Sequence, residues 1–175
     1  MSERHPNIVQ AADLPWIDTS GVKRATSPGD QDRGHQFAAQ ARPLSKPAGG
    51  VRLGCTLYEL ASGRKSFPFH YHLGNEEAIY ILEGAVTLRL GDREIALRAG
   101  DYAAFPPGPG HAHQLINASG ATVRYLCLST NDWPEIAVYP DSNKVGMFGG
   151  PPGDGSVRQF HRLGETLPYY DGEDR

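Results

Sequence analysis

Between residues 51 and 130, short apolar or alternating segments follow one another and are separated by turns that contain glycine. Each segment takes up about 8–12 residues, a spacing typical of β-sandwiches and small β-barrels. The clearest part is LEGAVTLRLGDREIALRAGDYAAFP at 82–106, where Val86, Leu88 and Leu90 alternate with polar residues as in a half-buried strand. The sequence therefore predicts an all-β fold.

The chain divides into three zones. Residues 1–50 are mostly polar and rich in turn formers, so we expect an N-terminal arm with one or two short strands. Residues 51–130 carry the strand pattern and are expected to form the barrel. Residues 131–175 are loop-like again, with the breaker-rich run MFGGPPGDG at 147–155. We expect them to form a C-terminal extension that packs on the barrel or on a partner subunit.

Length, charge and cysteine content narrow the functional classes. A chain of 175 residues suffices for one domain with arms. The net charge of −3 gives no electrostatic reason to expect a nucleic-acid or membrane partner. No apolar run approaches the ~20 residues of a membrane span, and the first residues lack a signal-peptide core. The two cysteines, Cys55 and Cys127, suggest no disulfide framework. We expect a cytoplasmic protein.

Two histidines and a glutamate form a candidate metal site within the strand region. His70 and His72 stand at positions i and i+2, so in a strand their rings project to the same face. Glu77 begins the next apolar segment and can place its carboxylate against the rings. Imidazole and carboxylate together suit Mn, Fe, Ni, Co or Zn. A fourth ligand would come from His111 or His113, which are also spaced i, i+2.

These residues resemble the first sequence motif of the cupin superfamily, G-x5-H-x-H-x3,4-E-x6-G. His70 and His72 are followed by four residues, then Glu77, then six residues and Gly84, as that motif requires. Gly63 stands one residue further upstream than the motif has it. The chance occurrence of such a pattern is small in a chain of this composition, so the resemblance is specific.

A second cupin motif, G-x5-P-x-G-x2-H-x3-N, is matched with a two-residue insertion. Its matching residues are Gly100, Pro106, Gly108 and Asn117. His111 has the expected distance from Gly108, whereas His113 has the expected distance to Asn117. We favour His113 as the ligand, because HQLIN continues as a strand while His111 lies in the Pro-Gly turn.

The resemblance covers about residues 50–130 and implies a double-stranded β-helix, a jelly-roll barrel open at one end, with extended N- and C-terminal arms. It further implies that one divalent transition-metal ion is bound by His70, His72, Glu77 and His113. Four protein ligands would leave about two positions for water or substrate. Glu76, next to Glu77, has the opposite strand parity and is expected at the surface.

The whole chain also resembles small bacterial single-domain cupins, some of which are labelled sugar-phosphate isomerases. The resemblance favours a metal-dependent enzyme acting on a small oxygenated metabolite, with an isomerase of a sugar or sugar phosphate preferred. An Fe(II)-dependent dioxygenase and a non-catalytic protein that binds or senses a small molecule remain as alternatives. A barrel with exposed edge strands and apolar arms is also expected to form a homodimer, as is usual among cupins.

Overall fold

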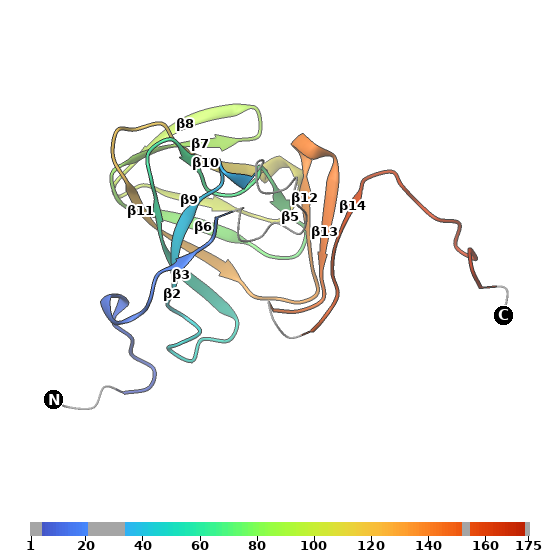
Figure 1. The fold of residues 1–175 in the computed structure, drawn as a ribbon, viewed down its shortest axis with the longest axis horizontal. Coiled ribbons are helices and arrows are strands. Elements are labelled where there is room, and N and C mark those ends of the chain that lie inside the picture. Colours follow the sequence, from blue (N-terminus) through green and yellow to red (C-terminus); the bar gives the residue numbers. More distant parts are fainter. Residues whose placement is uncertain (1–4, 21–33, 152–154, 174–175) are drawn as a thin grey trace.

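The computed structural model describes residues 5–20, 34–151 and 155–173, and its regular structure is almost entirely β-strand (Figure 1). The all-β prediction is therefore confirmed. The strands are β1 (Ile17–Asp18), β2 (Ala39–Pro43), β3 (Leu53–Leu60), β4 (Arg64–Lys65), β5 (Tyr71–His72), β6 (Glu77–Glu83), β7 (Ala85–Leu90), β8 (Arg93–Arg98), β9 (Tyr102–Phe105), β10 (His113–Asn117), β11 (Val123–Thr130), β12 (Glu135–Tyr139), β13 (Lys144–Phe148) and β14 (Arg158–Arg162). Short 3-10 helices occupy η1 (Ala11–Asp13), η2 (Pro109–His111) and η3 (Pro140–Ser142).

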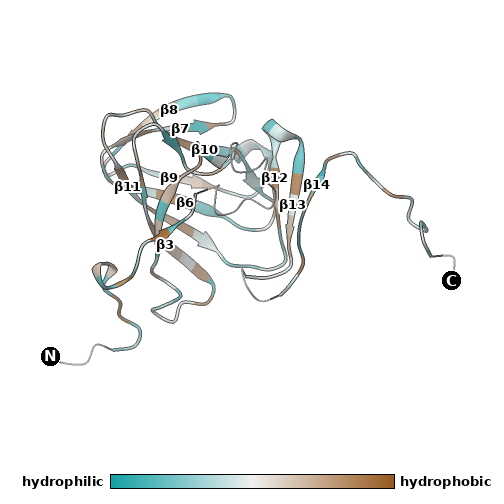
Figure 2. Ribbon diagram, viewed as in Figure 1, coloured by the Kyte–Doolittle hydropathy of each residue, from teal (hydrophilic) through white to brown (hydrophobic). Residues whose placement is uncertain are grey.

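The strands form three sheets. The first has the order β1-β2-β3-β11-β6-β9 and the second the order β4-β10-β7-β8. The core consists of apolar side chains that these two sheets contribute, and Leu60, Ile81 and Val123 are fully buried in it. Figure 2 shows hydrophobic stretches along β3 and β11, whereas the end formed by β7 and β8 is largely hydrophilic. The two sheets thus make the predicted barrel.

The alternating run at the centre of the sequence forms the expected antiparallel strands. In β7, Val86 and Leu88 are buried, and both face the core. Gly84 precedes this strand with φ +86°, a conformation in which a side chain is strained. A Cβ at this glycine would also lie 3.1 Å from Val123 Cγ2, so both the turn and the close packing require glycine here.

The third sheet corrects the expectation that residues 131–175 are loop-like. Its order is β14-β13-β12-β5, and it lies beside the barrel (Figure 1). The segment EIAVY of β12 has buried Glu135, Ala137 and Val138, and it pairs with β5 on one side and β13 on the other. The first two residues of the breaker-rich run, Met147 and Phe148, end β13, and the described residues of the run that follow belong to no strand.

The N-terminal segment extends the barrel of its own chain. β1 pairs with β2, and β2 pairs with β3 in antiparallel register. The guanidinium of Arg42 lies 4.1 Å from the ring centre of Trp16, which packs the segment onto β2. Within the described residues, the structure contains no helix that is long and apolar enough to span a membrane.

Candidate metal centre

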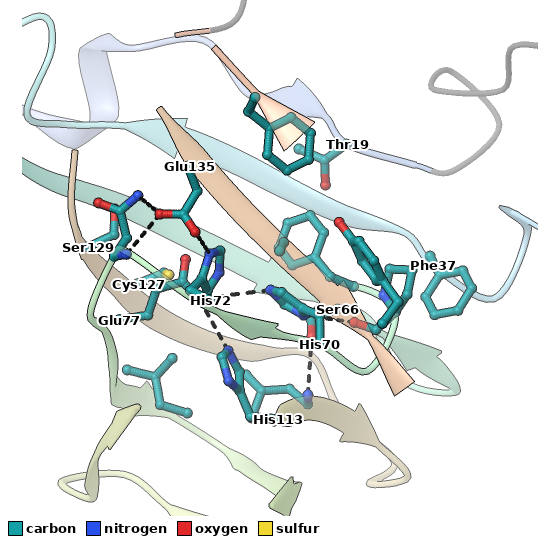
Figure 3. Close-up of a pocket in the computed structure, with 18 of the residues that line it drawn as sticks. Thr19, Phe37, Ser66, His70, His72, Glu77, His113, Cys127, Ser129 and Glu135 are labelled. Carbon is teal, nitrogen blue, oxygen red and sulfur yellow. Dashed lines mark hydrogen bonds and ion pairs between the residues drawn. The ribbon is translucent and has the colours of Figure 1, made fainter. Parts of the chain in front are cut away.

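The predicted site residues come together where the three sheets meet (Figure 3). His70 and His113 exchange main-chain hydrogen bonds of 3.3 and 2.8 Å in an isolated antiparallel bridge. This bridge ties the segment before β5 to the start of β10, and it leaves the two ring centres 4.8 Å apart. The ring centre of His72 lies 5.0 Å from that of His70.

Glu77, the first residue of β6, is the point on which the three imidazoles converge. Its Oε2 lies 3.2 Å from His113 Nε2, 3.3 Å from His72 Nε2 and 4.0 Å from His70 Nε2. The strand β6 does not pair with β5; the carboxylate reaches the rings from a different sheet. Ligand atoms of His70, Glu77 and His113 all lie within 4.8 Å of one another, so these three residues could hold a metal ion.

The hydrogen bonds of the other ring nitrogens orient two of the histidines. His70 Nδ1 lies 2.8 Å from the Pro68 carbonyl oxygen, and His113 Nδ1 lies 3.0 Å from the His111 carbonyl oxygen. A carbonyl accepts the Nδ1–H proton and so leaves the Nε2 lone pair free for a metal. His111 contributes this carbonyl from η2, while its ring does not line the pocket above the cluster. Glu76 is exposed, as expected.

His72 differs because its Nδ1 faces a second carboxylate, 3.4 Å from Glu135 Oε1. Glu135 is only 4% exposed. Its carboxylate accepts hydrogen bonds from the main-chain N–H groups of Asn75 (2.8 Å) and Ile136 (2.9 Å), and from the Asn75 side-chain amide. Glu135 thus fixes the turn between His72 and Glu77. The sequence reasoning missed this residue; the apolar run IAVY that follows it was a usable signal for a strand but not for a buried carboxylate.

The surroundings shift the pKa values of the cluster in opposite directions. Burial lowers the pKa of His70 to about 4, and the neighbouring His113 adds to this effect. Burial also lowers the pKa of His72, but the carboxylates of Glu135 and Glu77 outweigh it and raise the pKa to about 10. Burial favours the neutral form of Glu77, yet a hydrogen bond from His113 and the facing ring of His72 hold its pKa well below the usual range. The cluster therefore keeps Glu77 ionised and His70 neutral.

The residues present fit a transition-metal ion. Both ring nitrogens of His72 are buried, and each faces a carboxylate oxygen without a well-aligned hydrogen bond to any described residue. Leaving such a buried polar group unsatisfied costs about 1–3 kcal/mol. An ion between the rings and Glu77 would give Nε2 a partner. The donors, imidazole nitrogen and carboxylate oxygen, are those that Mn, Fe, Co, Ni and Zn accept.

The cluster opens into a pocket of about 660 Å³ that all three sheets line. On the barrel side, Tyr125 and Cys127 of β11 form part of its lining. Burial raises the pKa of both side chains well above their ordinary values, so both stay protonated. The Tyr125 hydroxyl is buried and has no hydrogen-bond partner among the residues that the structure describes.

Comparison with known proteins gives a family match and several structural relatives. Residues 56–129 match the family model described as the cupin domain. Comparison with curated protein sequences finds no match. A sugar phosphate isomerase of the cupin superfamily from Silicibacter pomeroyi is 26% identical, with a TM-score of 0.75, over 94% of this chain and 98% of that one.

Two further solved structures are similar. One, from Acidithiobacillus ferrooxidans and named a candidate sugar phosphate isomerase, is 19% identical over 82% of this chain and 95% of its own, with a TM-score of 0.70. A polyketide cyclase from Streptomyces resistomycificus is 25% identical over 77% of this chain and 84% of its own, with a TM-score of 0.55.

The matched residues run from β3 to β11 and include all four predicted ligands. The family match and the structural relatives confirm the double-stranded β-helix that the sequence motifs implied. Residues 56–129 are therefore a cupin domain, and the whole chain is similar to small proteins of the cupin superfamily.

Proposed function

We propose that this cupin is a metal-dependent enzyme acting on a small oxygenated metabolite, and that His70, His72, Glu77 and His113 together bind one divalent transition-metal ion. The observation that supports this most is the convergence of three imidazole Nε2 atoms on one carboxylate oxygen beside a pocket. When bound, such an ion supplies Lewis acidity, which lowers the pKa of a C–H or O–H bond next to a substrate oxygen.

The side chains around the cluster have complementary roles in this proposal. Tyr125 offers its protonated hydroxyl as a donor to a substrate oxygen, since the group has no partner in the described part of the chain. Glu135 acts through His72 and holds that ring in place. The apolar surroundings exclude water from the reacting atoms, which strengthens electrostatic interactions there.

Isomerase-type proton transfer is the reaction we favour. The support is that two relatives of similar length carry the name sugar phosphate isomerase, one of them 26% identical over 94% of this chain. Interconversion of an aldose phosphate and a ketose phosphate is therefore the first reaction to test. Oxygen consumption by the iron-loaded protein would instead identify a dioxygenase.

Metal analysis of purified protein tests the site directly. The unchanged chain should contain close to one ion, and the variants His72→Ala and Glu77→Ala should contain far less. Glu76→Ala is the matched control, because this carboxylate is adjacent to Glu77 but exposed. Metal content that stays undiminished in both site variants would refute the proposed ligand set. Absence of any isomer exchange by nuclear magnetic resonance across a panel of sugar phosphates would refute the isomerase assignment for that class.

A further inference from the structure

One face of the third sheet forms a wall of the pocket. His72 of β5 is in register with Ala137 of β12, which is in register with Gly146 of β13 and, through it, with Phe160 of β14. Side chains two positions apart on a strand point the same way, so the neighbours of this row share its face. They are Glu135, Tyr139, Lys144, Phe148, Arg158 and Arg162. All of them except Arg162 line the pocket.

Aromatic rings run continuously along this wall from the metal cluster outwards. Tyr139 is stacked on His70, with ring centres 5.8 Å apart and planes at 21°. Phe160 lies 5.9 Å from Tyr139, and Phe148 lies 5.7 Å from Phe160. Gly146 sits among them, and a Cβ there would come within 2.8 Å of Phe148 Cζ and 2.9 Å of Phe160 Cε1. The glycine therefore lets the rings lie over the strand.

Two cations stand beside these rings. Lys144 Nζ lies 5.0 Å from the ring centre of Tyr139 and 5.8 Å from that of Phe160. The guanidinium carbon of Arg158 lies 4.5 Å from the ring centre of Phe148. Among the residues that the structure describes, no carboxylate forms an ion pair with Lys144 or Arg158. Their charges are therefore available to an anion that enters the pocket.

Three of the hydroxyl groups that line the pocket already make a hydrogen bond within the protein. Ser66 Oγ accepts a hydrogen bond from the Leu115 N–H, and Thr130 Oγ1 donates one to Asn75. The Thr19 hydroxyl donates to a main-chain carbonyl. A polyhydroxylated ligand needs many unengaged partners, whereas a flat ring needs the faces of other rings. The wall described above supplies the second kind of contact.

We infer that the pocket takes a planar aromatic or conjugated substrate that carries an acidic group. The flat part stacks on the ring of Phe160 and meets the edge of Tyr139, whose plane is tilted by 56° to it, and the acidic group pairs with Lys144 and Arg158. This inference keeps the metal-dependent chemistry of the proposed function but replaces the sugar phosphate as its substrate. It rests on that function in one respect, namely that an oxygen of the substrate faces the metal cluster and the Tyr125 hydroxyl. A sugar phosphate would use the cations but not the rings.

Calorimetric titration of the full chain with three probes tests the inference. The probes are 2-naphthoate, its neutral analogue 2-naphthalenemethanol, and ribose 5-phosphate. We expect 2-naphthoate to bind most tightly, with the neutral analogue about tenfold weaker because it lacks the charge-assisted pair. Tighter binding of ribose 5-phosphate than of 2-naphthoate would overturn the inference.

Substitutions in the pocket wall test whether the probes bind to the wall, independently of the metal site. Lys144→Gln should weaken 2-naphthoate binding about tenfold and leave the neutral analogue unchanged. Gly146→Val should weaken both aromatic probes, since its side chain would displace the rings. Lys46→Gln, at an exposed lysine outside the pocket, is the control and should bind all probes as the unchanged chain does. If Lys144→Gln and Gly146→Val both bind 2-naphthoate as tightly as the unchanged chain does, the inference is overturned.

Metal content is measured in the same samples, so the two proposals can fail separately. Bound metal without 2-naphthoate binding refutes the substrate class and leaves the metal centre standing. Binding of 2-naphthoate with the expected variant effects, in protein that takes up no metal, refutes the proposed function and supports the inference about the wall.

Discussion

Replacing Glu135 by alanine removes the acceptor for several donors at once. The carboxylate accepts hydrogen bonds from the Asn75 and Ile136 N–H groups at 2.8 and 2.9 Å, and a longer one from Gly74 at 3.4 Å. Since Glu135 is only 4% exposed, water does not readily replace it. The turn between His72 and Glu77 would therefore lose the group that positions it.

The two short hydrogen bonds determine how much the free energy of unfolding should fall in Glu135→Ala. A hydrogen bond to a charged group contributes about 1.5–3 kcal/mol, so losing both would cost about 3–6 kcal/mol. Relief from holding a buried charge offsets part of this, and we expect the free energy of unfolding to fall by about 3 kcal/mol. Glu135→Gln keeps one acceptor oxygen, so its cost should be about half as large.

Urea unfolding monitored by circular dichroism measures the loss of stability in the Glu135 variants, because the midpoint and slope give the free energy of unfolding. The matched control is Glu83→Ala, whose carboxylate is exposed on β6 and 3.8 Å from Arg124. The same Glu135 variants should bind metal about 10–100-fold more weakly, since a partner of a ligating histidine is lost. A Glu135→Ala protein within 1 kcal/mol of the unchanged chain would refute the reasoning.

Four further outcomes follow from the structure. His113→Ala should lose bound metal while His111→Ala retains it, because the His111 contact to the site is a main-chain carbonyl; the reverse result in metal analysis would contradict the choice between them. Leu88→Ala should lower the free energy of unfolding by about 2–5 kcal/mol, since Leu88 is 2% exposed in the core; a change below about 1 kcal/mol in urea titration would speak against that packing. Metal at 100 times its dissociation constant should add about 2.7 kcal/mol of stability, seen as a melting temperature that drops on chelation, and no drop would argue against a bound ion. Light scattering should give about twice the chain mass of 19.0 kDa, as expected for a homodimer, whereas a mass near 19.0 kDa would exclude one at that concentration.

The barrel was predictable because its signals are local. Alternation in β7 and the glycines at its turns depend on neighbours within a few residues, and Gly84 takes up the positive φ that its turn requires. The meeting of His70, His72 and Glu77 was also predictable from their spacing, and the second family motif together with the strand pattern of HQLIN favoured His113.

The third sheet was missed because what stabilises it is distant in the sequence. Glu135 is buried by donors at Gly74 and Asn75, about sixty positions earlier in the chain. A carboxylate next to a loop-rich region reads as a surface group unless those donors are known. The same holds for Tyr139, whose place in the site depends on the ring of His70.

The residues around Glu77 belong to three separate sheets. Glu77 comes from the first sheet, His113 from the second and His72 from the third. An ion bound by all of them would act as a cross-link between segments that could otherwise open independently. Local opening of the third sheet would then require a ligand to leave the ion, so amide hydrogen exchange in β12 should slow when the metal is bound. Metal supply would thereby set how often the pocket wall separates from the barrel.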